Sequence, residues 1–193
     1  MKTFPELKTK RLRLRNVHIN DVPSILKYAN NKAISDNVLN IPNPYLEDEV
    51  LYWIEMAQQG FKKNVRYAFA INLTENRELI GVIGLSIDKD HNKAELGFWV
   101  GEPFWGRGIM TEAAEEILKF GFGKLNLNKI YTTHFIDNPA SGKVLSKNGM
   151  IMEGELKDHY LRNNVYRSVI MYRLTKEEYE EQKKTQSNKT NSL

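Results

Sequence analysis

The residues best placed to do chemistry form a glycine turn in the middle of the chain. The run Phe104-Trp-Gly-Arg-Gly lies between a strand pattern over 93–100 and a helical pattern that begins at Ile109. Its two glycines allow positive φ and a close backbone approach, so several amide N–H groups can meet one anion beside the positive end of the helix. Arg107 and the hydroxyl of Thr111 can add contacts. The turn is therefore a candidate phosphate site, although a plain connection between strand and helix has the same pattern.

Better-known chemistries are excluded by what the chain lacks. The dinucleotide fingerprint needs a third glycine where Thr111 stands, and the nucleoside-triphosphate loop needs Gly-Lys-Ser/Thr, which does not occur. With no cysteine there is no thiolate nucleophile. The four histidines have no metal-ligand spacing, and the pattern around His134 favours a packed residue on a sheet face. We therefore expect no metal.

The elements that must position the turn follow from periodicity. Strand patterns cover Leu12 to Val17, Tyr67 to Asn72, Leu79 to Asp88, Lys93 to Val100 and Lys129 to Ile136. Helical patterns run from about Asp21 to Asn30, Glu47 to Gln59, Ile109 to Gly121 and Ala140 to Lys147. Met152 to Leu174 predicts a hairpin that turns at Asn163 and Asn164. Arg11, Arg13 and Arg15 alternate with the apolar residues of the first strand, which predicts a solvent-exposed arginine face.

The bulk composition favours one domain. The chain has 193 residues, 41% of them hydrophobic and 27% charged, enough for a single core. Its net charge of +4 is small and scattered, which predicts no nucleic-acid partner. No stretch reaches the roughly 18 apolar residues that span a bilayer, so we expect a cytoplasmic protein without a membrane partner. We place the domain at 1–175 and expect the polar tail, 176–193, to be a frayed helical turn that runs into disorder.

Two blocks of sequence resemble the GNAT superfamily of N-acetyltransferases. Ala94-Glu-Leu-Gly-Phe-Trp-Val with Pro103-Phe-Trp-Gly-Arg-Gly-Ile-Met-Thr-Glu-Ala is similar to that family's acetyl-CoA motif, Gln/Arg-x-x-Gly-x-Gly/Ala. Asn138-Pro-Ala-Ser resembles its Asn-x-x-Ser segment. Pro103 departs from the motif's first position, as in the branch that acetylates the amino termini of ribosomal proteins. The resemblance covers about 7–174.

The resemblance implies an α+β (mixed α/β) fold. A single domain would hold a mixed sheet of about six or seven strands, splayed at the fourth strand, 93–100, with about four helices around it. Acetyl-CoA would be the cosubstrate, its pantetheine arm pairing with the open strand edge. The cofactor-binding residues implied are Phe98, Trp99, Val100, Trp105, Gly106, Arg107, Gly108, Ile109, Met110, Thr111, Asn138 and Ser141.

Two side chains are candidates for proton transfer to or from the reacting groups. Alternation puts Glu95 on one strand face with Gly97 and Trp99, where it can take a proton from the acceptor ammonium; a surface carboxylate paired with a lysine is the alternative. The resemblance implies that Ser141 lies near the thioester, where it can protonate the leaving thiolate, and helix N-capping is its alternative. Tyr160 and Tyr166 are weaker acid candidates.

The sequence leaves the acceptor open. It predicts acetyl transfer to a primary amine, either a protein amino terminus, such as that of a ribosomal protein, or a small amine. The alternative is a catalytically silent sensor that binds CoA. Acceptor choice would depend on the loop from Asn37 to Tyr45 and on the hairpin turn at 162–164. A homodimer is suggested by the family resemblance alone.

Overall fold

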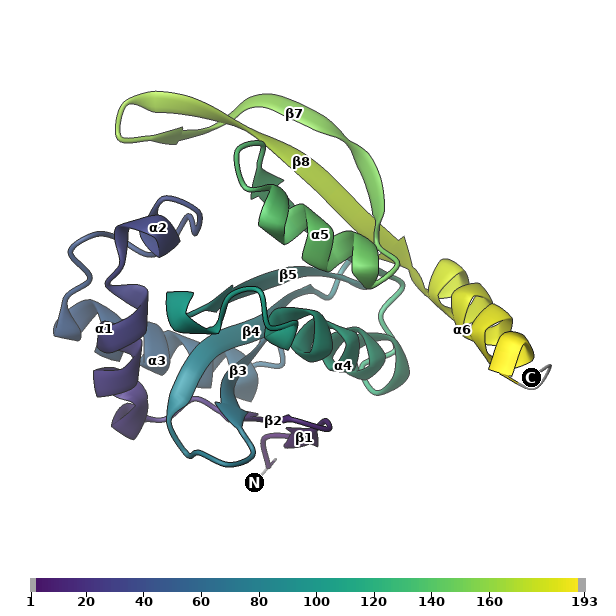
Figure 1. Ribbon diagram of the computed structural model, residues 1–193, viewed down its shortest axis with the longest axis horizontal. Coiled ribbons are helices and arrows are strands. Elements are labelled where there is room, and N and C mark those ends of the chain that lie inside the picture. The colour runs from purple at the N-terminus through teal and green to yellow at the C-terminus, as the bar shows by residue number, and fades with distance from the viewer. Residues whose placement is uncertain (1–2, 191–193) are drawn as a thin grey trace.

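The computed structural model describes residues 3–190 and contains one mixed sheet. Its eight strands are β1 (Leu7–Lys8), β2 (Leu12–Asn16), β3 (Arg66–Leu73), β4 (Leu79–Asp88), β5 (Lys93–Val100), β6 (Lys129–Phe135), β7 (Ile151–Arg162) and β8 (Val165–Thr175). They follow the order β1-β2-β3-β4-β5-β6-β8-β7, and β5 and β6 form a parallel pair (Figure 1). The predicted fold class is confirmed. The strand beyond the expected six or seven is β1, which is too short to show a period of two.

Helices cover both faces of the sheet. The α-helices are α1 (Val22–Ala29), α2 (Lys32–Ser35), α3 (Glu47–Lys62), α4 (Ile109–Gly123), α5 (Pro139–Lys147) and α6 (Lys176–Thr190). The 3₁₀ helices are η1 (Ile19–Asp21) and η2 (Glu102–Phe104). Helix α4 packs on one face, in a core with Leu96, while α1 and α3 pack on the other (Figure 1). Alternation along β5 thus separates the two cores, as its sequence predicts.

Helix α3 continues past Gln59, where the sequence predicted its end. Gly60 lies inside α3, and a Cβ added there would lie 2.6 Å from the Cβ of Arg66 on β3. The residue is therefore small because the neighbouring strand approaches closely, not because the helix stops.

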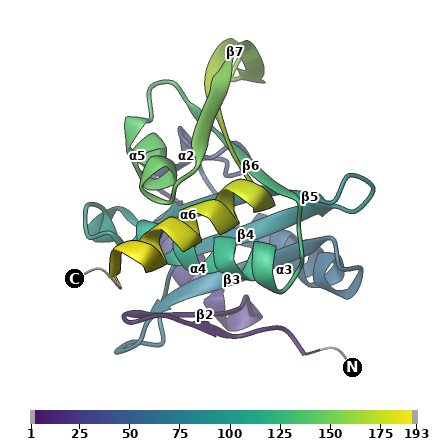
Figure 2. The ribbon, with the colours of Figure 1, turned by 90° about the vertical axis from the view of Figure 1, so that its right-hand side faces the viewer.

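The helical turn predicted at the start of the tail is longer than expected, because residues 176–190 form helix α6 (Figure 2). Tyr179 stacks on Phe122 with ring centroids 4.8 Å apart, and Gln182 Nε2 donates to the carbonyl of Gly149 at 3.0 Å. These contacts come from distant parts of the chain, which is why a polar sequence without an apolar stripe did not predict them. Residues 191–193 lie outside the described part of the chain.

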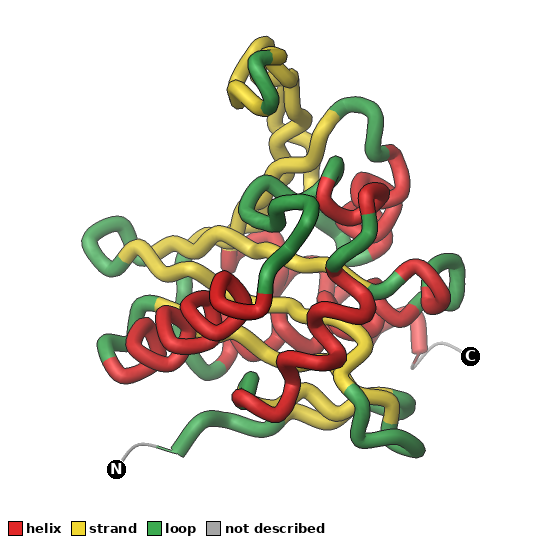
Figure 3. The backbone as a smooth tube through the Cα atoms, turned by 90° about the vertical axis from the view of Figure 1, so that its left-hand side faces the viewer, coloured by secondary structure: helices red, strands yellow, loops and turns green. Residues whose placement is uncertain are grey.

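The predicted hairpin is present and projects from the sheet. Asn163 and Asn164 form its turn with φ of 49° and 59°, and β7 and β8 lead into and out of it. Strand β8 pairs with β6 only from Val169 to Thr175, so the rest of the hairpin pairs with itself and stands clear of the sheet (Figures 2 and 3).

Candidate active site

The sheet opens between β5 and β6. These strands pair at only three positions, and the ladder ends where Glu95 faces Tyr131. On its other side β5 pairs with β4 along its full length, up to Val100. The edge of β5 beyond Glu95 therefore turns its backbone groups into the opening, where an extended ligand can pair with them.

The glycine turn has the geometry of an anion cradle. Gly106 and Gly108 have φ of 72° and 71°, in the left-handed region that favours glycine. Gly108 is the N-cap of α4 and makes no side-chain cap. Within residues 3–190, the amide N–H groups of 106–111 donate to no backbone or side-chain oxygen. A Cβ at Gly106 would meet no atom within 4 Å, so these amides border open space in which a phosphate group fits.

An arginine directly before β2 supports this turn. Arg11 Nη1 donates to the carbonyl of Arg107 at 2.9 Å, while its Nε donates to Glu112 Oε2 at 2.6 Å. Burial opposes ionisation of Glu112, but hydrogen bonds from Thr9 and Arg11 outweigh it and lower the pKa of that carboxyl. Sequence reasoning assigned Arg11 to a solvent-exposed face and missed this contact, because no local pattern relates Arg11 to Arg107.

Trp105 contacts the C-terminal end of β5, at Val100. Its Nε1 donates to the carbonyl of Val100 at 2.7 Å, and its side chain is 46% exposed. One of the main-chain groups predicted to hold the pantetheine arm thus already accepts a hydrogen bond. A carbonyl oxygen has a second lone pair, so the position remains available to a ligand.

A hollow of about 170 Å³ lies at the opening of the sheet, and we call it the splay hollow. It is lined by Asn37, Val38, Leu39, Asn40, Glu95, Leu96, Gly97, Phe98, Thr132, Thr133, His134, Phe135, Ser141, Tyr160 and Val169. Three predicted site residues, Glu95, Phe98 and Ser141, therefore meet in one place. Tyr166 does not join them, because its side chain is 64% exposed on the hairpin.

Glu95 is the carboxylate of the splay hollow. Its side chain is exposed to solvent, but the surrounding protein desolvates it and raises the pKa of Glu95 above its ordinary value. No ion pair to Glu95 occurs in the described chain, which removes the predicted alternative of a lysine-paired surface carboxylate. The group is therefore free to accept a proton.

Ser141 does not cap helix α5. Asn138 is the N-cap, and its Oδ1 accepts from the amide of Ser141 at 3.2 Å. Asn138 Nδ2 donates to Ser141 Oγ at 3.0 Å, so the Ser141 hydroxyl keeps its own proton to donate. The capping alternative for Ser141 is wrong, and Asn138 acts instead to orient this hydroxyl.

A larger cleft of about 700 Å³ adjoins the splay hollow. The two share Val38, Asn40, Gly97 and Phe98 as lining residues. A Cβ at Gly97 would meet no atom within 4 Å, so the strand presents a bare backbone between them. The remainder of this large cleft is mostly apolar and aromatic, with Tyr45, Tyr52, Trp53, Met56 and Trp99, and also contains the acidic residues Asp48 and Glu49.

The sequence matches a known family over most of its length. A family model described as "Acetyltransferase (GNAT) domain" matches residues 11–151. The chain belongs to the GNAT acetyltransferases. It is an acetyl-CoA-dependent N-acetyltransferase, which confirms the predicted family, activity and cosubstrate.

Several relatives of this GNAT enzyme are similar over nearly their whole length. It is 30% identical to an uncharacterized N-acetyltransferase p20 of Bacillus licheniformis, covering 90% of this chain and 97% of that one. It is 25% identical to the ribosomal protein uS5-alanine N-acetyltransferase of Escherichia coli, covering 88% and 90%. A solved ribosomal L7/L12 alpha-N-protein acetyltransferase in complex with coenzyme A has a TM-score of 0.81 at 22% identity, covering 89% and 98%.

His134 lines the splay hollow of the GNAT enzyme, and its ring is fixed by contacts with neighbouring residues. Its Nδ1 lies 2.8 Å from the carbonyl of Phe135, and its ring lies 5.6 Å from that of Tyr172. Residues 3–190 contain no cluster of three acidic or histidine side chains that could hold a metal ion. They also contain no helix long and apolar enough to cross a membrane.

Proposed function

We propose that this GNAT enzyme acetylates the α-amine of a protein amino terminus, with a ribosomal protein as the first acceptor to test. The observation that carries the proposal is the large cleft, which meets the splay hollow across Gly97. An amine in the hollow can reach Glu95 while the rest of a peptide extends into about 700 Å³ of cleft, at about 3.3 Å per residue. A small amine would leave most of that cleft empty. The named activity of the uS5-alanine relative supports the same choice.

The proposed cofactor site uses backbone groups at both ends of β5. The amides from Gly106 to Thr111, with Arg107 beside them, would bind the pyrophosphate at the N-terminus of α4. The open edge of β5 from Phe98 to Val100 would pair with the pantetheine arm. Asn138 and Ser141 would lie on its other side. When bound, acetyl-CoA supplies the acetyl group as a reactive thioester.

The residues of the splay hollow have separate roles in this proposal. An α-ammonium has a pKa of about 8 and must lose a proton before its nitrogen can attack. Glu95 accepts that proton in its carboxylate form, directly or through water, because it lines the hollow and has no ion-pair partner in the described chain. The Ser141 hydroxyl gives a proton to the departing sulfur, and Asn138 holds it for this purpose.

The test is a panel of hexapeptides with free amino termini, incubated with labelled acetyl-CoA, with spermidine and an aminoglycoside as small-amine arms. Transfer to peptide α-amines with small amines near background is the expected result. Transfer to spermidine alone would replace the proposed acceptor with a small amine. CoA binding by calorimetry without transfer to any amine from pH 6 to 9 would establish the silent sensor instead.

Three further predictions from the sequence belong with this function. The enzyme would act in the cytoplasm, with neither nucleic acid nor membrane as a partner, and as a homodimer. Light scattering of the purified protein measures the assembly, and a mass near that of one chain would remove the dimer from the proposal.

A further inference from the structure

The tip of the β7–β8 hairpin reaches a loop that is distant in sequence. Pairing between β6 and β8 ends at Phe135 and Val169, and beyond that point the two hairpin strands pair only with each other. Arg162 is the last residue of β7 and directly precedes the turn. The free end of the hairpin extends toward α2 and the segment after it (Figure 1). We call that segment, residues 36–46 between α2 and α3, the 36–46 loop.

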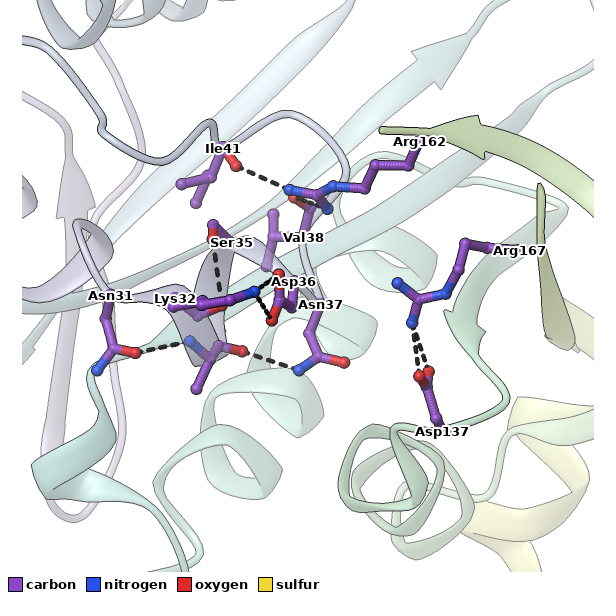
Figure 4. Close-up of polar contacts among 11 residues, drawn as sticks. Asn31, Lys32, Ser35, Asp36, Asn37, Val38, Ile41, Asp137, Arg162 and Arg167 are labelled. Atoms are coloured by element: carbon purple, nitrogen blue, oxygen red, sulfur yellow. Dashed lines mark hydrogen bonds and ion pairs between the residues drawn. The ribbon is translucent and has the colours of Figure 1, made fainter. Parts of the chain in front are cut away.

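Arg162 ties the hairpin to this loop with two hydrogen bonds. Its Nη1 donates to the carbonyl of Val38 at 3.0 Å and its Nη2 to the carbonyl of Ile41 at 3.1 Å (Figure 4). The two carbonyls belong to one turn of the loop, in which the amide of Ile41 also donates to Val38 at a longer 3.3 Å. The planar guanidinium therefore fixes both ends of a turn that its own backbone bond holds weakly.

Arg162 is a half-buried cation that forms no ion pair in the described chain. Burial lowers the pKa of Arg162, and no carboxylate within residues 3–190 forms an ion pair with it. Arg167, on the other strand of the hairpin, shows the common arrangement, with both oxygens of Asp137 at 2.7 Å from its Nη2 (Figure 4). Arg162 thus hydrogen-bonds two neutral carbonyls, while the carboxylate of Asp36 favours its charged form from beyond ion-pair distance.

The loop that Arg162 holds is a wall of the proposed active site. Val38 and Asn40 line both the splay hollow and the large cleft, and Ile41 lines the large cleft. Tyr160, two residues before Arg162 and so on the same face of β7, lines the hollow. The contact thus joins the two segments, hairpin and 36–46 loop, that border the place where the acceptor enters.

We propose that Arg162 is the positioning residue that fixes the 36–46 loop as the acceptor-binding wall and thereby favours extended peptides over small amines. The inference rests on the proposed function. A peptide must contact the wall beyond the hollow, so it gains from a wall that is already in place. An amine that fills only the hollow meets a smaller part of the wall, from residue 37 to 40, so it gains less from the fixed loop.

The experiment compares Arg162→Met and Arg162→Lys with the parent protein. The acceptors are the best hexapeptide from the amino-terminal panel and the amino-acid amide of its first residue, which keeps the amine and removes the rest. Arg173→Met is the matched control, because Arg173 lies at the base of the same hairpin and pairs with Glu178 there. The rate of amide hydrogen exchange in the 36–46 loop reports directly on whether Arg162 still holds the loop.

Arg162→Met should accelerate exchange in the loop and lower kcat/KM for the hexapeptide by about 10- to 100-fold, mainly through KM. For the amino-acid amide acceptor, kcat/KM should change by less than about threefold. The affinity for CoA should not change. Lysine cannot bond two carbonyls with one planar fork, so Arg162→Lys should fall between parent and Met variant.

Unchanged loop exchange, or equal losses for hexapeptide and amide, would overturn the inference. A parent enzyme that acetylates no peptide at all would remove the proposed function, and the specificity role would fail with it. A parent that acetylates the hexapeptide beside an equally active Arg162→Met variant would overturn the inference alone.

Discussion

Glu95→Gln gives the sharpest test of the catalytic proposal, because it changes one ionisable group in the splay hollow and keeps its shape. The ionised carboxylate is the proposed base, and burial raises its pKa. Activity of the parent should therefore fall as the pH drops through that raised pKa, at a higher pH than an ordinary glutamate would give. At a pH above the pKa of Glu95, the parent should be able to acetylate an acceptor that binds in its ammonium form.

The size of the effect follows from the acceptor. An α-amine with a pKa of about 8 is about 1% neutral at pH 6 and about 90% neutral at pH 9. Without the carboxylate only the neutral fraction reacts, so kcat/KM of Glu95→Gln should be about 100-fold below the parent at pH 6. At pH 9 the two should agree within about twofold.

The assay is kcat/KM for a hexapeptide acceptor from pH 5.5 to 9.5, with the CoA affinity of each protein measured alongside. Glu75→Gln, in the exposed turn between β3 and β4, is the matched control and should follow the parent. A ratio of parent to variant that stays constant with pH, or equal rates throughout, would show that Glu95 does not take the proton.

Four further changes test the rest of the site. Gly108→Val places a β-branched residue at φ 71°, which costs about 1–2 kcal/mol, so the melting temperature should fall by a few degrees. Calorimetry should detect no CoA binding, and retained affinity would refute the placement of the phosphate site at this turn. Arg11→Met releases the Arg107 carbonyl and should weaken CoA binding about tenfold by calorimetry, whereas parental affinity would make Arg11 a surface residue. Glu112→Gln should lower the melting temperature at pH 7. The difference from the parent should vanish as the pH falls through the lowered pKa of Glu112, because the parent carboxyl is then protonated too, and a pH-independent difference would contradict the ion-pair argument. Ser141→Ala should reduce kcat about 100-fold in a steady-state transfer assay at saturating acetyl-CoA, and an unchanged kcat would remove its acid role.

Much of the site could be predicted because its signals are local. Alternation along 93–100 predicts which face carries Glu95, and the glycines at 106 and 108 predict the left-handed turn that the backbone adopts. The two adjacent asparagines predict the hairpin turn in the same way. Each of these properties is fixed by the φ preference or the side-chain period of a few neighbouring residues.

Only the tertiary structure decided which distant residues complete the site. Arg11 reaches Arg107 across 96 positions, and Arg162 reaches Val38 across 124. In sequence, both arginines look like ordinary charged residues on exposed strands. Their bonds to backbone carbonyls exist because α4 packs across the sheet as far as β2 and because the hairpin extends to the 36–46 loop. A local pattern contains no information about such meetings, since they depend on how the whole sheet packs.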